Sequence, residues 1–217
     1  MHIYEKDGKK YPSVTTIIHI LGNDEIIRWA NSLGFRHKKY DEELDKYAVR
    51  GTKVHDYLHS IVDPTYTLVE TPKDIFEQKE IEAICSRFKL FLMKYDWKTV
   101  FTEKTIISEK LGYAGTLDWL AVINNFLLVN DFKTSKTVRF SMLLQLGGYN
   151  NLLKEIGYNA DGGSIILANN KLCSMYPINK TELEYYSDAF NKLAEYYHFI
   201  MDHTMSPDLK LLEDLTK

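Results

Sequence analysis

The stretch GYAGTLDWLAVINNFLLVNDFKTSK, residues 112–136, carries the clearest indication of the fold of this chain. Two runs within it, residues 113–123 and 126–133, are rich in β-branched, aromatic and aliphatic side chains, which is typical of buried strands. Asn124 and Asn125 separate the runs, and asparagine tolerates the positive φ angles of a two-residue turn. The sequence therefore predicts an antiparallel hairpin.

The register of this hairpin brings two acidic residues together. Counting back from the Asn-Asn turn on one strand and forward on the other pairs Asp118 with Asp131. Opposed residues have Cβ atoms about 4.5–5.5 Å apart, where two like charges destabilise a sheet. Lys133 lies two residues after Asp131 and shares its face. A divalent cation would offset the repulsion, so the sequence predicts a metal site beside a lysine.

A third acidic residue, Glu103, depends on the register of the preceding strand. A four-residue loop at 109–112, ending on Gly112, would set Glu103 opposite Asp118 on the same face. A loop shifted by one residue would turn Glu103 to the other face of the sheet. Glu103 is therefore a candidate catalytic residue whose position follows from the loop.

An Asp-x-Lys motif alone is weak evidence for a site. The chain contains it twice more, as Asp-Gly-Lys at residues 7–9 and Asp-Leu-Lys at residues 208–210, and we interpret both as surface turns. On a strand, such a pair is most often a solvated ion pair. In the hairpin the neighbouring residues are apolar, so Asp118 and Asp131 are expected to be buried, and buried unpaired carboxylates require an explanation.

Carboxylate oxygens are hard ligands that suit Mg²⁺ or Mn²⁺. These ions keep several waters and bridge to phosphate oxygens. A metal-bound water near Lys133 could be deprotonated or positioned for in-line attack on phosphorus. The residue types therefore indicate phosphate ester hydrolysis with one or two metal ions.

Helical periodicity surrounds the strands. We expect helices at residues 14–21, 25–33, 48–62, 73–95, 138–156 and 182–203, and further strands at residues 99–107, 163–169 and 172–178. Ser13 and Gly22 bound the first helix as its N-cap and its glycine stop. These elements predict one α/β domain, residues 1–217, with a mainly helical lobe in residues 1–95 and a sheet core in residues 96–205.

Composition excludes several classes of protein. The formal net charge is −3, so contact with nucleic acid must come from local basic patches. Cys85 and Cys173 are the two cysteines, expected as buried thiols and too few for a four-thiolate zinc site or an iron–sulfur cluster. No apolar run has the length of a membrane span, and the N-terminus has the features of neither a signal nor a transit peptide. We expect a cytoplasmic protein.

Five blocks form a set of motifs between residues 11 and 149. They are Tyr-Pro-Ser-Val-Thr-Thr at 11–16, Arg-Gly-Thr-Lys-Val-His at 50–55, Gly-Tyr-Ala-Gly-Thr-Leu-Asp at 112–118, Asp-Phe-Lys-Thr-Ser-Lys at 131–136 and Gln-Leu-Gly-Gly-Tyr at 145–149. With these motifs the chain resembles the PD-(D/E)xK nucleases, in particular their RecB-like exonuclease branch, which includes phage and mitochondrial single-strand exonucleases. The resemblance implies a restriction-endonuclease-like α/β core, a central mixed β-sheet flanked by helices, with an N-terminal helical lobe.

The resemblance also assigns roles to residues. It implies that Lys133 orients or activates water and that Gln145 and Tyr149 belong to a Gln-x-x-x-Tyr motif, whose members share one helix face. The implied ligands of Mg²⁺ or Mn²⁺ are His55, Asp118, Asp131 and the backbone carbonyl of Phe132. The cysteines of the cluster-bearing, helicase-fused branches are absent from this sequence, so no iron–sulfur cluster is expected.

The implied activity is that of a metal-dependent DNA nuclease, an exonuclease acting in replication, recombination or repair. The expected partners are DNA, single-stranded or with free ends, and a replication or recombination protein. Basic residues near the motifs are candidates for DNA contact. They are Arg50, Lys53, Lys136 and Arg139. A structure-specific endonuclease is an alternative, since the sequence leaves exo- and endonucleolytic cleavage, strand polarity and strand number open.

Two other functions fit parts of the sequence. His55 and His59 have the spacing of a zinc-protease helix, but Asp56 stands where that motif has glutamate and no third ligand is evident. On the nuclease hypothesis His59 is partly buried or faces solvent, and both histidines could be ordinary helix-surface residues. A non-catalytic DNA-binding subunit could keep the fold, although paired carboxylates without a metal would repel phosphate. We therefore favour the enzyme.

Overall fold

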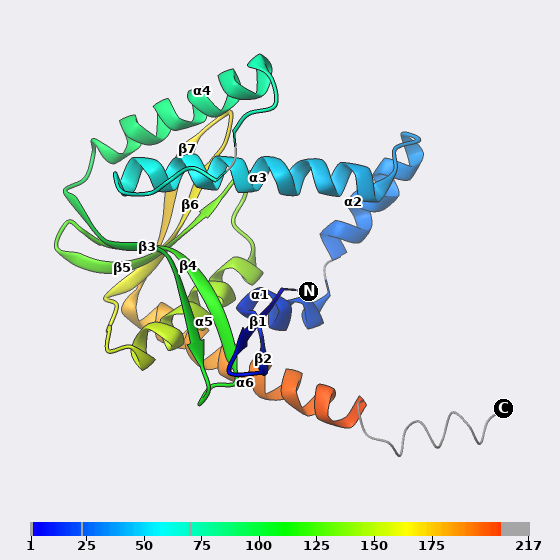
Figure 1. Ribbon diagram of the computed structural model, residues 1–217, viewed down its shortest axis with the longest axis vertical. Helices are drawn as coiled ribbons and strands as arrows, with labels where there is room; N and C mark the ends of the chain where they lie inside the picture. The colour runs from blue at the N-terminus through cyan, green and yellow to red at the C-terminus, as the bar shows by residue number, and fades with distance from the viewer. Residues whose placement is uncertain (1, 23, 70, 205–217) are drawn as a thin grey trace.

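Five strands form the centre of the molecule. The computed structural model describes residues 2–22, 24–69 and 71–204. In the central sheet, β5 and β6 run parallel and the other neighbouring strands run antiparallel. The strands, in spatial order, are β3 (Trp97–Ser108), β4 (Tyr113–Ile123), β5 (Phe126–Lys133), β6 (Gly162–Ala168) and β7 (Cys173–Asn179). Figure 1 shows this mixed sheet flanked by helices, as expected of a restriction-endonuclease-like core.

The β4–β5 hairpin has the predicted turn and register. Asn124 and Asn125 adopt φ angles of 49° and 70°, as a tight hairpin turn requires. The strands pair as predicted from the turn as far as Trp119 and Asn130, where the ladder ends. The next residue on each strand is one of the two predicted carboxylates, which therefore lie where β4 and β5 separate.

The β3–β4 connection also has the predicted register. Ser108 pairs with Tyr113 across the loop at 109–112, and Gly112 supplies a φ of 73° there. Pairing continues on both sides of Glu103, but Glu103 itself leaves the ladder and adopts a φ of 46°. Its place in the register is thus the expected one, with a local distortion that the sequence did not indicate.

Helices cover both faces of the sheet. On one face, α5 (Phe140–Glu155) crosses from β5 to β6 and packs against α6 (Lys180–Thr204). On the other face, α3 (Tyr40–Val62) packs with α4 (Ile75–Leu92), which contacts β6 and β7. No helix in the described part of the chain is both long and apolar enough to cross a membrane.

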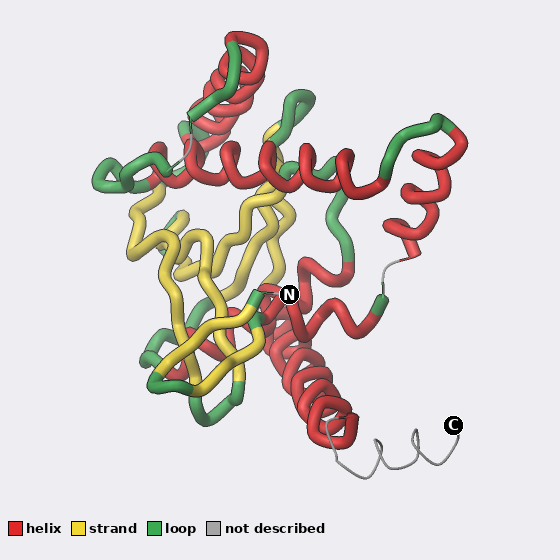
Figure 2. Tube along the Cα trace, turned by 45° about the vertical axis from the view of Figure 1, so that its right-hand side comes forward, coloured by secondary structure: helices red, strands yellow, loops and turns green. Residues whose placement is uncertain are grey.

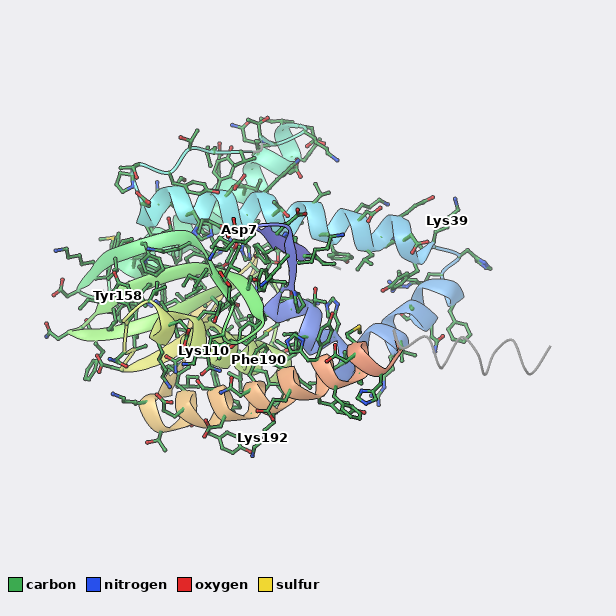
Figure 3. All side chains as sticks on the ribbon, turned by 60° about the horizontal axis from the view of Figure 1, so that its bottom comes forward. Asp7, Lys39, Lys110, Tyr158, Phe190 and Lys192 are labelled. Atoms are coloured by element: carbon green, nitrogen blue, oxygen red, sulfur yellow. The ribbon has the colours of Figure 1, made fainter. Side chains whose placement is uncertain are left out.

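Buried residues of the strands divide between two cores. Leu120 and Val129 pack into the cluster that includes residues of α5 and α6. Trp119 and Phe132 pack into the cluster that includes residues of α3 and α4. In Figure 3, Phe190 lies on the inner side of α6, and it is fully buried. Alternating residues of one strand therefore anchor helices on opposite faces, as the pleat of a β-strand dictates.

The N-terminal region contains a small hairpin that the sequence analysis did not predict. β1 (Ile3–Lys6) and β2 (Lys9–Pro12) pair through a turn at Asp7 and Gly8, both with positive φ. Their residues are mostly exposed, so no apolar alternation marks them. Figure 2 shows this β-ribbon lying against the central sheet. The hydroxyls of Tyr4 and Thr116 form a hydrogen bond of 2.8 Å between the two.

The following helices begin near their expected positions. Ser13 caps α1 (Val14–Ile18) by accepting a hydrogen bond from Thr16 N at 3.0 Å, as predicted. A 3₁₀ turn (His19–Leu21) continues the helix to Gly22, which has a φ of 69°. α2 (Asp24–Phe35) lies within one to two residues of its expected bounds.

α3 and α4 differ most from their predicted bounds, whereas α5 and α6 lie within two residues of theirs. α3 begins at Tyr40 rather than at residue 48, and three acidic residues in its first turn stabilise that end through the helix dipole. α4 ends at Leu92 and is capped by Asp74, whose side chain accepts from the backbone N–H groups of Phe76 and Glu77. The predicted turn at residues 208–210 lies outside the described residues.

Candidate metal centre

The candidate site lies where β4 and β5 separate, and helices on both faces of the sheet reach it. Asp118 comes from β4, and Asp131 and Lys133 come from β5. α3 contributes His55, and α5 contributes Gln145. The structure thus brings together residues that lie far apart in the sequence, as the motifs predicted.

The two carboxylates are buried. Asp118 Oδ2 accepts a hydrogen bond of 2.8 Å from the backbone N–H of Phe132. Asp131 is 0% exposed, and its Oδ2 contacts Lys133 Nζ. Asp131 Oδ1 receives no hydrogen bond from the described residues. Leaving a buried carboxylate oxygen without a donor is costly, so a cation at this position would stabilise the folded protein.

Burial and charge perturb the titration of both carboxyls. Burial raises the pKa of Asp131 to about 6, and the neighbouring Asp118 adds to that rise while Lys133 opposes it. Burial also raises the pKa of Asp118. The mutual repulsion that the hairpin register predicted is therefore present in the folded chain.

His55 is suited to ligate a metal. Its Nδ1 lies 3.6 Å from Asp118 Oδ2. Desolvation within the site and the Lys133 ammonium lower the pKa of His55 to about 4. The imidazole is therefore neutral at physiological pH, which is the form that binds metals.

The predicted exposure of His59 is wrong. It is 0% exposed rather than partly buried or solvent-facing. Its ring packs against those of Phe132 and Tyr66, with centroid distances of 5.2 Å and 5.4 Å. The reason is that α3 lies over the sheet, so its inward face is held against β5 rather than exposed.

The described residues fit a divalent cation. Ligand atoms of His55, His59 and Asp118 all lie within 4.8 Å of one another, and ligands on one ion are about 3–4 Å apart when each bond is near 2.1 Å. The structure thus places a carboxylate from β4 beside the histidine pair, for which the sequence showed no third candidate ligand. The cluster could hold a metal together with the unpaired oxygen of Asp131.

Gln145 and Tyr149 share a face of α5, as their spacing predicts. Gln145 Nε2 donates to Tyr149 OH at 2.7 Å. Burial raises the pKa of Tyr149 well above its usual value, and the charge of Asp131 adds to the rise. The Tyr149 hydroxyl is therefore neutral, and it lies close enough to Asp131 and Asp118 for their charges to affect its pKa.

Two cavities meet at His55. The larger one, of about 1180 Å³, lies between the end of α1, the loop after β5 and the start of α5. Its lining includes His55, Lys133, Arg139, Phe140 and Gln145. A smaller cavity of about 440 Å³ is lined by His55, Glu103, Tyr66 and Thr52 among others. Among the candidate metal ligands, His55 therefore borders both cavities.

The four predicted DNA-contact residues fall into two groups. Lys136 is exposed and Arg139 lines the larger cavity. Arg50 donates two hydrogen bonds to Glu80 on α4, of 2.8 and 3.2 Å. Lys53 is 2% exposed and pairs with Glu77 at 2.8 Å. The acidic partners of Arg50 and Lys53 come from another helix, which the sequence motifs did not indicate.

Comparisons with known proteins give structural likeness at low identity. No protein-family model and no curated protein matches the chain. SSO0001 matches over 92% of this chain and 78% of its own, with 14% identity and a TM-score of 0.47. A "Putative exonuclease" from Eubacterium rectale matches over 65% of this chain and 64% of its own, with 13% identity and a TM-score of 0.43. LHK-Exo in complex with dAMP matches over 72% of this chain and 97% of its own, with 10% identity and a TM-score of 0.30.

Proposed function

We propose that this chain is a metal-dependent nuclease that hydrolyses phosphodiester bonds in DNA, and specifically an exonuclease. One observation carries the proposal. Asp131 is buried beside Asp118 and Lys133 with one oxygen that no described residue satisfies, in a cluster that borders a cavity lined by Lys133 and Arg139. A structural ion pair would have no need of an access route or of an unsatisfied oxygen.

The proposed metal ligands are His55, Asp118, Asp131 and the carbonyl of Phe132. A Mg²⁺ or Mn²⁺ ion held there would supply Lewis acidity toward a phosphate oxygen and lower the pKa of a bound water. Neutral imidazole and carboxylate are the forms that these residues present near pH 7, given their pKa values of about 4 for His55 and about 6 for Asp131.

Lys133 is the proposed catalytic cation. Its ammonium touches Asp131, which fixes its direction, and it lines the larger cavity. From this position it can orient the attacking water and stabilise negative charge that develops on the phosphorus oxygens. Gln145, which lines the same cavity and bonds to Tyr149, is proposed to position the scissile phosphate.

The larger cavity is the proposed path of the DNA strand. Lys133 and Arg139 provide positive charge within it, Lys136 lies nearby in the loop before α5, and the exposed ring of Phe140 can stack on a base. Arg50 and Lys53 would join only by exchanging their present glutamate partners. Glu103, which faces the smaller cavity, is a further proposed participant.

The experiment is incubation of the full chain with end-labelled single-stranded DNA, end-labelled duplex and closed circles, each with Mg²⁺, Mn²⁺, Ca²⁺ or EDTA. We expect cleavage of DNA with free ends in Mg²⁺ or Mn²⁺, and none in EDTA or Ca²⁺, because the looser Ca²⁺ shell does not hold water and phosphate in line. Cleavage of circles would contradict the exonuclease assignment. Binding without cleavage in every metal would instead indicate a non-catalytic DNA-binding subunit.

A further inference from the structure

His59 and Glu103 face each other beside the proposed metal site, and neither belongs to the proposed ligand set of His55, Asp118, Asp131 and the carbonyl of Phe132. His59 Nε2 lies 2.7 Å from Glu103 Oε1. His59 is on α3 and Glu103 is on β3, so the contact joins a helix to the edge of the sheet. The rings of His55 and His59 lie with centroids 6.3 Å apart, and Glu103 lines the same small cavity as His55.

The ring nitrogens of His59 are unsatisfied. Both are buried, and neither forms a hydrogen bond of acceptable geometry within the described residues, despite the short approach of Glu103. The surrounding rings of Phe132 and Tyr66 offer no donor to them. A fully buried imidazole without a hydrogen bond is unfavourable, and an ion bound to one ring nitrogen would remove that defect.

The backbone is distorted at Glu103, the residue whose carboxylate meets His59. Its φ of 46° lies in the left-handed region, which is unfavourable for a residue with a Cβ atom. The residues on both sides, Thr102 and Lys104, keep their pairing with β4. The distortion is therefore confined to the residue whose carboxylate meets His59, and a favourable contact of that carboxylate must offset its cost.

We propose that His59 and Glu103 complete a cation site with His55 and Asp118, made of two imidazoles and two carboxylates. Two ligands at right angles on one ion lie about 3 Å apart when each bond is near 2.1 Å. The 2.7 Å between His59 Nε2 and Glu103 Oε1 is close to that spacing, and His55, His59 and Asp118 already converge within 4.8 Å.

This donor set favours a first-row transition ion over Mg²⁺. Mg²⁺ prefers oxygen ligands and keeps several waters, whereas imidazole nitrogen suits transition ions. We therefore assign the site to a transition ion, represented by Mn²⁺. The catalytic role of this ion rests on the proposed function. Its affinity for the protein is measured without DNA and does not depend on that function.

The test is calorimetric titration of the metal-stripped full chain with Mn²⁺ and, separately, with Mg²⁺. We expect Mn²⁺ to bind at least about tenfold more tightly than Mg²⁺, and His59→Gln and Glu103→Gln each to weaken Mn²⁺ binding at least about tenfold. Glu103 has a side chain 36% exposed, so Glu103→Gln is expected to fold. Mn²⁺ affinities in both variants equal to that of the parent would overturn the proposal.

A matched control is His198→Gln. His198 Nε2 is also buried without a hydrogen-bond partner among the described residues, but its ring lies against Gly112 in the loop that precedes β4. We expect parental Mn²⁺ affinity in this variant. A loss as large as that in His59→Gln would show that the effect is a general cost of removing a buried histidine, and would overturn the assignment.

A spectroscopic measurement separates this proposal from the proposed function. The electron spin-echo spectrum of bound Mn²⁺ should show coupling to two imidazole nitrogens in the parent and to one in His59→Gln. Coupling to a single imidazole in the parent would overturn the two-histidine site even if DNA is cleaved. Two imidazoles in a parent that cleaves no DNA would support this site and refute the nuclease.

Discussion

The β4–β5 hairpin and the middle of α3 both carry buried charged residues, but only those of α3 have their charges fully paired within the fold. In the hairpin, Asp131 is completely buried and keeps an oxygen without a hydrogen bond from the described residues. On α3, Lys53 is almost as deeply buried, yet its ammonium meets Glu77 at 2.8 Å. Arg50, one turn earlier, has a bidentate partner in Glu80.

A ligand-binding site and a structural ion pair can be told apart by whether the fold supplies the partner charge. A buried charge that the fold neutralises holds two helices together, whereas a buried charge that the fold leaves incomplete destabilises the protein until a ligand arrives. The sequence predicted DNA contact for Arg50 and Lys53 and metal binding for Asp131. Their partners in space make Arg50 and Lys53 part of α3–α4 contacts and leave Asp131 in a candidate metal centre.

The largest expected effect comes from removing the hairpin carboxylates. Asp118→Asn and Asp131→Asn should each abolish cleavage and reduce or remove the thermal stabilisation that Mn²⁺ gives the parent, because an amide lacks the charge that attracts the ion. The metal-free variants should be at least as stable as the parent, because repulsion is relieved. Melting curves with and without Mn²⁺ decide this. A variant that keeps the full metal-dependent shift would show that its carboxylate does not contribute to the site.

Lys133→Ala tests the proposed catalytic cation. We expect kcat to fall about 10²–10⁴-fold, the usual contribution of a positioned acid or base, while DNA binding persists through the other cations. Lys98→Ala, which removes an exposed lysine on β3, is the control and should cleave at the parental rate. If Lys133→Ala lost binding and turnover equally, Lys133 would be a phosphate anchor.

Lys53→Met tests the opposite region. Removing the ammonium leaves Glu77 without its buried partner, so we expect the free energy of unfolding to drop by about 3 kcal/mol, measured by urea denaturation. The salt dependence of DNA binding should stay that of the parent if Lys53 is structural. A salt slope reduced by about one would support the DNA contact that the sequence predicted.

A smaller effect concerns pH. The pKa of Asp131 rises from 3.8 to about 6 on folding, so the folded state binds its proton more tightly than the unfolded state does. Its stabilising contribution is complete below about pH 4 and is lost as the pH rises through 6. Metal-free parent should therefore lose about 1–2 kcal/mol of stability relative to Asp131→Asn between pH 5 and 7. Parallel stability curves would show that Asp131 titrates normally.

Local features of the sequence predicted much of the fold. The Asn-Asn turn fixed the hairpin register, and Ser13 and Gly22 marked the ends of the first helical segment. The β1–β2 ribbon could not be predicted because its exposed residues show no alternation. The start of α3 was placed eight residues too late, although its acidic first turn is a recognisable signal.

The sequence predicted the part of the candidate site that depends on local strand pairing, and missed the part that depends on how α3 packs. Asp118, Asp131 and Lys133 follow from strand pairing, which counting along the chain can establish. The burial of His59 and its approach to Glu103 depend on how α3 lies over the sheet, and that packing joins segments of the chain that no local pattern relates. The glutamate partners of Arg50 and Lys53 were missed for the same reason, being 30 and 24 residues away.

The parallel pairing of β5 with β6 has a consequence for the order in which the candidate metal site forms. Antiparallel hairpins close locally, whereas a parallel pair must wait for its crossover, here α5, to be formed. During synthesis the β4–β5 hairpin can therefore pair before β6 has left the ribosome, but Asp131 gains its β6 neighbour Ile165 only afterwards. We expect the nascent chain to bring its acidic residues together early and to enclose them late, so that the candidate metal site is complete only after β6 has been synthesised.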